Sequence, residues 1–166
     1  MQTKEYRTID RAAERWPSGP WDNEPDKAQW PDAATGLPCL AVRSRRGNWC
    51  GYVGVTEEHP LFGKHSGSDE LYEANLDVHG GITFTDACAP DGDEASRICH
   101  TPDPGEPDHV WWIGFDCHHF MDFTPRCVVE ERERGYPFTI CEGASYRTLE
   151  YVREQCAHLA QQLKTP

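Results

Sequence analysis

Histidine, aspartate and cysteine gather in the middle of the chain, between residues 65 and 125. Six of the eight histidines lie there, and the densest run is Asp116-Cys117-His118-His119, with Asp122 three residues later. Imidazole, carboxylate and thiol groups are the side chains that bind transition metals. The block therefore predicts a metal-binding or acid–base site, although it does not identify a substrate.

Two of these segments fall at the ends of predicted strands, where their side chains can converge. His79 opens one strand, and the Gly80-Gly81 pair beside it allows close approach because it carries no Cβ atoms. Three protein ligands would leave a metal, most simply zinc, with an open position for water. We expect catalytic roles for His79, Asp116 and His119. The expected ligands of a divalent metal are His79, His100, Asp116, His119 and Asp122, with His100 carried in by a long loop.

Structural roles compete with this interpretation. The spacing matches no metal-ligand signature such as H-E-x-x-H, and a single histidine in a strand is commonly a hydrogen-bonded structural residue. Asp116 and Asp122 are equally suited to capping turns. A nucleophilic pair of Cys117 or Cys99 with His79 is a further alternative.

The charge of the chain is concentrated in the same block. Residues 65–125 contain thirteen acidic residues and one basic residue, and this −12 equals the net charge of the whole protein. Such a surface disfavours direct binding of nucleic-acid phosphates and of anionic membranes. The expected partners are a small molecule or a bacterial protein.

The cysteines bear on the cellular compartment. The N-terminal residues form no apolar leader, and no apolar run approaches the roughly 20 residues that span a bilayer, so we expect a cytoplasmic protein. The eight cysteines never come closer than ten residues, which excludes a C-x-x-C motif. In a reducing compartment we expect most of them to be thiols packed in the core.

The elements that must position the site indicate an α+β fold with a small, mostly antiparallel sheet, a long C-terminal amphipathic helix and extensive loops. Ser145 is the expected N-cap of this helix, and Leu149, Val152, Cys156, Leu159 and Leu163 mark its apolar face. Periodicity and composition place strands at residues 37–42, 49–56, 78–85 and 110–117, with a further strand at 138–141.

Residues 1–33 and 34–166 are expected to differ in organisation. The first segment predicts a short helix capped by Thr8 and ended by Pro17, followed by an irregular arm. The second predicts a single α+β domain. Within it, residues 90–109 form a long loop, which in a small domain is commonly functional or disordered.

A series of ordered motifs suggests a family. These are W-C-G-Y-V-G-V at residues 49–55, D-V-H-G-G-I-T-F at 77–84, I-C-H at 98–100, W-W-I-G-F-D-C at 111–117 and Tyr146-Arg147. The series resembles small uncharacterised proteins encoded by tailed bacteriophages and prophages, over roughly residues 34–164. The family pattern G-F-D-C-x-H-x-x-D matches Asp116, Cys117, His119 and Asp122 and leaves His118 at a free position. The resemblance implies a phage-type origin and action in the bacterial host cytoplasm, but no activity.

Together these observations predict a phage-type accessory protein with a His/Asp(/Cys) site. The expected chemistry is metal binding and hydrolysis of a nucleotide or other phosphoester. One alternative is a non-catalytic interaction protein that binds or blocks a bacterial host or defence factor through its acidic middle. Another is a protein that sequesters a small ligand. Acidic residues that converge on the histidines would favour a site, and acids spread over the surface would favour a partner.

Overall fold

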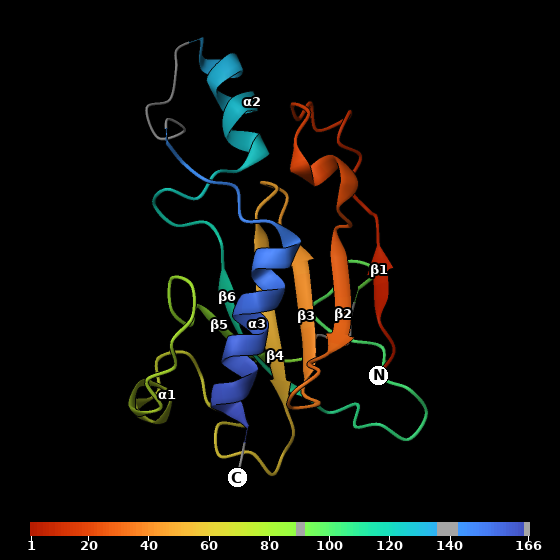
Figure 1. Ribbon diagram of the computed structural model, residues 1–166, viewed down its shortest axis with the longest axis vertical. Coiled ribbons are helices and arrows are strands. Elements are labelled where there is room, and N and C mark those ends of the chain that lie inside the picture. The colour runs from red at the N-terminus through yellow and green to blue at the C-terminus, as the bar shows by residue number, and fades with distance from the viewer. Residues whose placement is uncertain (89–91, 136–142, 165–166) are drawn as a thin grey trace.

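A single antiparallel sheet of six strands forms the centre of the protein (Figure 1). The computed structural model describes residues 1–88, 92–135 and 143–164. Within them the strand order is β1-β2-β3-β4-β6-β5, which confirms the expected α+β class. The strands are β1 (Lys4–Tyr6), β2 (Lys27–Pro31), β3 (Pro38–Arg43), β4 (Trp49–Val55), β5 (Phe84–Ala87) and β6 (Trp111–Asp116). The expected strand at 138–141 lies outside the described residues.

The long C-terminal helix covers one face of this sheet (Figure 1). It is α3 (Leu149–Leu163), and its N-cap is Thr148 rather than Ser145, because the Thr148 hydroxyl accepts the amide hydrogen of Tyr151 at 3.2 Å. The other helical segments are η1 (Pro20–Asn23), α1 (Asp69–Glu73) and α2 (Pro125–Arg134). None of the described helices combines the length and the apolar character that crossing a membrane requires.

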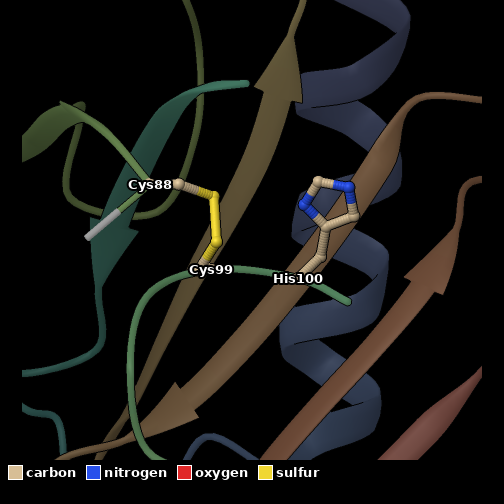
Figure 2. Close-up of side chains that lie close together, drawn as sticks. All are labelled: Cys88, Cys99 and His100. Atoms are coloured by element: carbon tan, nitrogen blue, oxygen red, sulfur yellow. A yellow bond between two sulfur atoms is a disulfide. The ribbon is translucent and has the colours of Figure 1, made fainter. Parts of the chain in front are cut away.

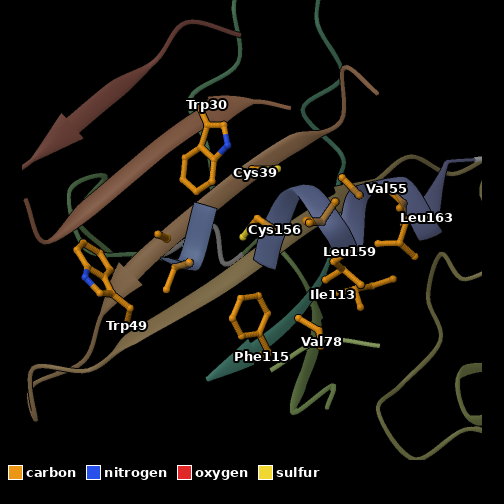
Figure 3. Close-up of a cluster of buried hydrophobic side chains, with 14 of the residues drawn as sticks. Trp30, Cys39, Trp49, Val55, Val78, Ile113, Phe115, Cys156, Leu159 and Leu163 are labelled. Carbon is orange, nitrogen blue, oxygen red and sulfur yellow. The ribbon is translucent and has the colours of Figure 1, made fainter. Parts of the chain in front are cut away.

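Alternation along β6 divides the core between the two faces of the sheet. Ile113 and Phe115 point toward α3 and pack in its cluster, whereas Trp112 points to the opposite face. Figure 3 shows the α3 side, where Cys156 and Leu159 enter the same cluster. A strand buried on both faces explains the nearly continuous apolar run that the sequence shows here.

Residues 1–33 fold differently from the expected helix and irregular arm. The amides of Thr8 and Ile9 both donate to the Asp26 carboxylate at 2.8 Å. A helix capped by Thr8 does not form, and the segment instead supplies β1, η1 and β2.

The third expected strand is also shorter than residues 78–85. Gly80 and Gly81 have positive φ angles of 68° and 83°, so the chain turns there and extends only at Phe84.

The cysteines among the described residues divide into two chemical groups. Cys39, Cys50, Cys117 and Cys156 are free thiols, and three of them are buried. The expectation of thiols is wrong for Cys88 and Cys99, which form a disulfide, and for Cys127, which is also disulfide-bonded. The loop after β5 returns to the sheet and brings the Cα atoms of Cys88 and Cys99 to 4.8 Å. Sequence spacing alone does not reveal such a return.

A buried ionic cluster ties the N-terminal segment to the sheet and to α3. The fully buried Arg43 side chain binds Asp26 at 3.1 Å and Glu24 at 2.8 Å. Asp26 also pairs with Arg11 at 2.7 Å. Glu24 accepts the amide hydrogen of Leu149, the first residue of α3, at 2.8 Å. The cluster therefore fixes three segments that lie far apart in the sequence.

Both carboxylates of this cluster are held in their charged form. Burial alone would raise the pKa of Glu24, but hydrogen bonds from Tyr146, the Leu149 amide and Arg43 outweigh it and lower that pKa. Burial likewise opposes ionisation of Asp26, and its bonds to Arg11 and two backbone amides lower its pKa. Groups with a lowered pKa stabilise the fold above the pKa of the unfolded chain, and this stability is lost as the pH falls through the folded value.

We predict that Asp26→Ala lowers the free energy of unfolding at neutral pH by about 3 kcal/mol, because Arg43 loses a buried partner. The difference from the unmodified protein should shrink as the pH falls below the ordinary aspartate pKa of about 3.9. Urea unfolding at neutral and at acid pH measures both effects. Asp108→Ala, at an exposed position, is the control and should cost less than about 0.5 kcal/mol. An equal loss for Asp26→Ala at both pH values would contradict the assignment.

Candidate functional site

The candidate site lies where the loop before β5 meets the loop after β6, beside α3. Val78 anchors the first loop, because its side chain is buried in the core cluster with Phe115 and Leu159 (Figure 3). Cys117 anchors the second loop, since it is buried and its amide donates to the Trp49 carbonyl at 2.9 Å. These two anchors place His79 and His119 close to each other.

The His79 side chain is held by hydrogen bonds at both ring nitrogens. Its Nε2 atom lies 2.7 Å from Oδ2 of Asp122, and its Nδ1 atom lies 2.9 Å from the Tyr151 hydroxyl. The His79 amide also donates to Oε1 of Gln155 at 2.9 Å. Tyr151 and Gln155 are four residues apart on α3, so one face of the helix sets the position of this histidine.

Asp122 is the central acceptor of the site. Its side chain is only 1% exposed, and Oδ1 accepts a hydrogen bond from Nε of Arg147 at 2.8 Å. Oδ2 accepts from the His119 amide at 3.0 Å as well as from His79. Burial would raise the pKa of Asp122, but these bonds, led by that from Arg147, outweigh it and lower the pKa. A charged carboxylate is therefore fixed between two histidines.

His119 completes the group, and one of its ring nitrogens has no partner. The His79 and His119 rings are 5.5 Å apart between centroids, and Nδ1 of His119 lies 3.7 Å from Oδ2 of Asp122. This Nδ1 atom is buried and makes no hydrogen bond among the described residues. The ring fills the space over Gly80, where a Cβ atom would come within 2.1 Å of it. Gly80 therefore has the close-approach role that the sequence predicted for the pair, whereas a Cβ atom at Gly81 would meet nothing within 4 Å.

The donor atoms lie close enough together that they could hold a metal ion. One ligand atom each from His79, His119 and Asp122 lies within 4.8 Å of the others. Ligands of a tetrahedral zinc ion with bonds of 2.0–2.1 Å stand about 3.3 Å apart. The distances of 2.7 and 3.7 Å from Oδ2 of Asp122 to the two imidazoles bracket this value. Small side-chain rotations would therefore form the site.

Asp116 lies at the margin of this group. Its Oδ1 atom is 3.9 Å from Nδ1 of His119, and it accepts the amide hydrogen of His118 at 2.9 Å. Asp122 caps the same loop through the His119 amide. The turn-capping alternative for both aspartates is thus correct, and for Asp122 it coexists with a position between the histidines.

His100 does not join the site, contrary to the sequence prediction. It packs edge-on against Trp112 with centroids 5.4 Å apart, and Trp112 points away from α3. The sheet therefore separates His100 from His79 and His119. The nucleophile alternative also fails, because Cys99 is in a disulfide and burial raises the pKa of the Cys117 thiol well above its ordinary value.

Sequence reasoning missed the residues that α3 and the segment before it contribute. Tyr151 and Gln155 contact His79, and Arg147 binds Asp122. The Arg147 guanidinium also stands over the Tyr151 ring, 5.0 Å from its centroid. A signal was present, since residues 147, 151 and 155 follow one another at intervals of four along one polar flank of the helical pattern.

A cavity of about 300 Å³ borders the site on the side of α2. Its lining includes His119 and Asp122 together with Arg46, His118, Glu130 and Arg134. Arg46 is paired with Glu130 at 3.0 Å. The two arginines of the lining are balanced by the carboxylates of Asp122 and Glu130.

Comparison of the chain with protein-family models, with curated proteins and with solved structures gives no match.

Proposed function

We propose that the protein is a metal-dependent hydrolase whose ion is held by His79, His119 and Asp122. The observation that carries the proposal is the buried Nδ1 atom of His119, which has no hydrogen-bond partner among the described residues and lies 3.7 Å from the Asp122 carboxylate. An unpaired polar atom is costly inside a protein. A metal ion between His119, Asp122 and His79 removes that cost.

The hydrogen bonds around the site suit a metal ion. When no metal is bound, Nε2 of His79 carries a proton and donates it in a hydrogen bond to Oδ2 of Asp122. A cation takes the place of this proton, and Nδ1 of His79 then donates to the Tyr151 hydroxyl, the type of outer contact that orients ligating histidines. Two imidazoles and one carboxylate suit zinc and leave a coordination position for water. The same donor set also holds iron(II), so elemental analysis identifies the ion.

The proposed substrate is an anionic ester such as a nucleotide or other phosphoester. Arg147 is fixed beside the site by its bond to Asp122, and its side chain remains 30% exposed. Arg46 and Arg134 line the adjoining cavity, where an anionic ester would compete with Glu130 for Arg46. Guanidinium groups bind phosphate oxygens strongly, and a metal-bound water is the nucleophile in hydrolysis of this class.

We further propose a phage-type origin and action in the bacterial cytoplasm, which rest on the motif resemblance alone.

A second candidate function, binding of a basic bacterial protein, is favoured by the distribution of the acids. Of the described acids between residues 65 and 125, Asp122 lies between the histidines and Asp116 lies at their margin, whereas Asp69, Glu70 and Glu73 are exposed on α1. Replacing those three with lysine would abolish partner binding without changing the metal content.

The metal assignment predicts a bound ion that depends on His119. Protein with its disulfides intact should bind about one equivalent of zinc, and a chelator should lower its melting temperature because the ion binds only the native state. His119→Ala should abolish both effects. Elemental analysis and thermal melting provide the two measurements.

His118→Ala is the matched control, because His118 is adjacent and exposed but is absent from the ligand group. It should keep the zinc and the chelator effect. Equal zinc content in the two alanine variants would refute the assignment.

A separate prediction concerns Tyr151, which orients His79 without touching the proposed ion. Tyr151→Phe should lower metal affinity or metal-dependent hydrolysis of a chromogenic phosphodiester by about 10–100-fold, the usual effect of losing an outer hydrogen bond. Tyr72→Phe, at a side chain that is 87% exposed, should change neither quantity. Equal behaviour of the two variants would show that Tyr151 is not part of the site.

A further inference from the structure

A second group of metal-binding side chains lies on the opposite face of the sheet. Cys88, Cys99 and His100 place one potential ligand atom each within 4.8 Å of the others. Figure 2 shows the His100 ring beside the disulfide, with one ring nitrogen on the side of the sulfur atoms. No residue of the group belongs to the His79 site, so the inference is independent of the proposed function.

His100 has one buried ring nitrogen that is available to bind a metal. Its side chain is buried, and its Nδ1 atom makes no hydrogen bond among the described residues. Histidine ligates a metal as the neutral ring, through a nitrogen that carries a lone pair. Nδ1 of His100 is available for this role because no hydrogen bond occupies it among the described residues.

The surroundings of the two sulfur atoms also fit thiolate ligands. The indole Nε1–H of Trp112 donates to Sγ of Cys88 at 3.3 Å, a contact that stabilises a thiolate. The buried Lys27 ammonium donates to the Cys99 carbonyl at 2.8 Å and places positive charge beside the loop. Two thiolates and a neutral imidazole around a divalent ion have no net charge, which suits a site that is largely buried.

We propose that Cys88, Cys99 and His100 form a zinc-type site when the disulfide is reduced. A dithiol reductant supplies two electrons and two protons, so the S–S bond breaks, two thiols form and the reductant becomes a disulfide. Binding of the ion then releases the two thiol protons. Zinc–sulfur bonds of 2.3 Å separate two sulfurs by about 3.8 Å, and Cα atoms 4.8 Å apart allow this by side-chain rotation. Reducing conditions therefore create the site, and oxidation to the disulfide expels the ion.

The test uses cobalt(II) as a spectroscopic substitute for zinc, in the His119→Ala background that removes the first site. The reduced, oxygen-free protein should develop thiolate-to-cobalt charge-transfer absorption that saturates near one equivalent. The oxidised protein should show none. Cys88→Ser should abolish the absorption, whereas Cys50→Ser, at a half-buried free thiol, should leave it unchanged. Absorption that survives Cys88→Ser would overturn the proposal.

A second measurement uses the unmodified chain and so does not depend on the folding of a variant. Reduced protein is alkylated with and without zinc, and each cysteine is quantified by peptide mass spectrometry. Zinc should slow alkylation of Cys88 and Cys99 at least tenfold and leave Cys50 unaffected. Equal alkylation of Cys88 and Cys99 with and without zinc would contradict the proposal, even if the His79 site binds metal as proposed.

Discussion

The packing of α3 against one face of the sheet positions the side chains of the candidate site. Cys156 and Leu159 are fully buried against β3, β4 and β6. At Gly51 a Cβ atom would come within 3.0 Å of the Cys156 sulfur and 2.4 Å of Phe115, so only glycine permits this approach. Burial of each large aliphatic side chain contributes roughly 1.5–3 kcal/mol. The polar flank of the same helix then holds His79 at a fixed place.

The site thus derives its geometry from hydrogen bonds made by side chains of elements that the core packing holds in place. Tyr151 and Gln155 stand one helical turn apart and contact the His79 ring and backbone. Arg147, just before the helix, fixes Asp122. A ligand set held by elements that are themselves packed needs little reorganisation to bind an ion. Within this frame, Nδ1 of His119 is buried and has no hydrogen-bond partner among the described residues.

The sheet also separates two kinds of chemistry. The face covered by α3 carries nitrogen and oxygen donors at His79, His119 and Asp122, whereas the other face carries sulfur donors with His100. Alternation along β6 produces this division, because Phe115 and Trp112 point in opposite directions. If both sets bind metal as proposed, binding by the first would be independent of thiol oxidation state, whereas binding by the second would require the dithiol. The two proposals therefore differ in their expected response to redox conditions.

Local periodicity explains which features were predictable from sequence. The apolar stripe of α3 and the strands around Trp49 and Ile113 follow from spacing within single elements. The meeting of His79 and His119 followed from their positions at strand ends. The path of a long loop is not encoded locally, so His100 was assigned to the wrong face. A polar helix flank resembles a solvated surface, which concealed the role of Tyr151.

Contacts between residues distant in the sequence account for the other differences between the predicted and the observed structure. Thr8 is a reasonable helix cap in isolation, but the Asp26 carboxylate takes its amide and that of Ile9. Cys88 and Cys99 looked like core thiols because they are eleven residues apart and lack a short motif. Their pairing depends on a chain reversal between β5 and β6. Long-range contacts of this kind leave no periodic signal in the sequence.

The proposed metal site is tested most directly by the zinc X-ray absorption spectrum of the disulfide-intact protein loaded with one equivalent of zinc. Coordination by the three proposed ligands predicts a first shell of nitrogen and oxygen only, with outer scattering from two imidazole rings. Such a shell corresponds to His79, His119 and Asp122, with water at the open position. Sulfur in the first shell, or the absence of imidazole scattering, would contradict the assignment.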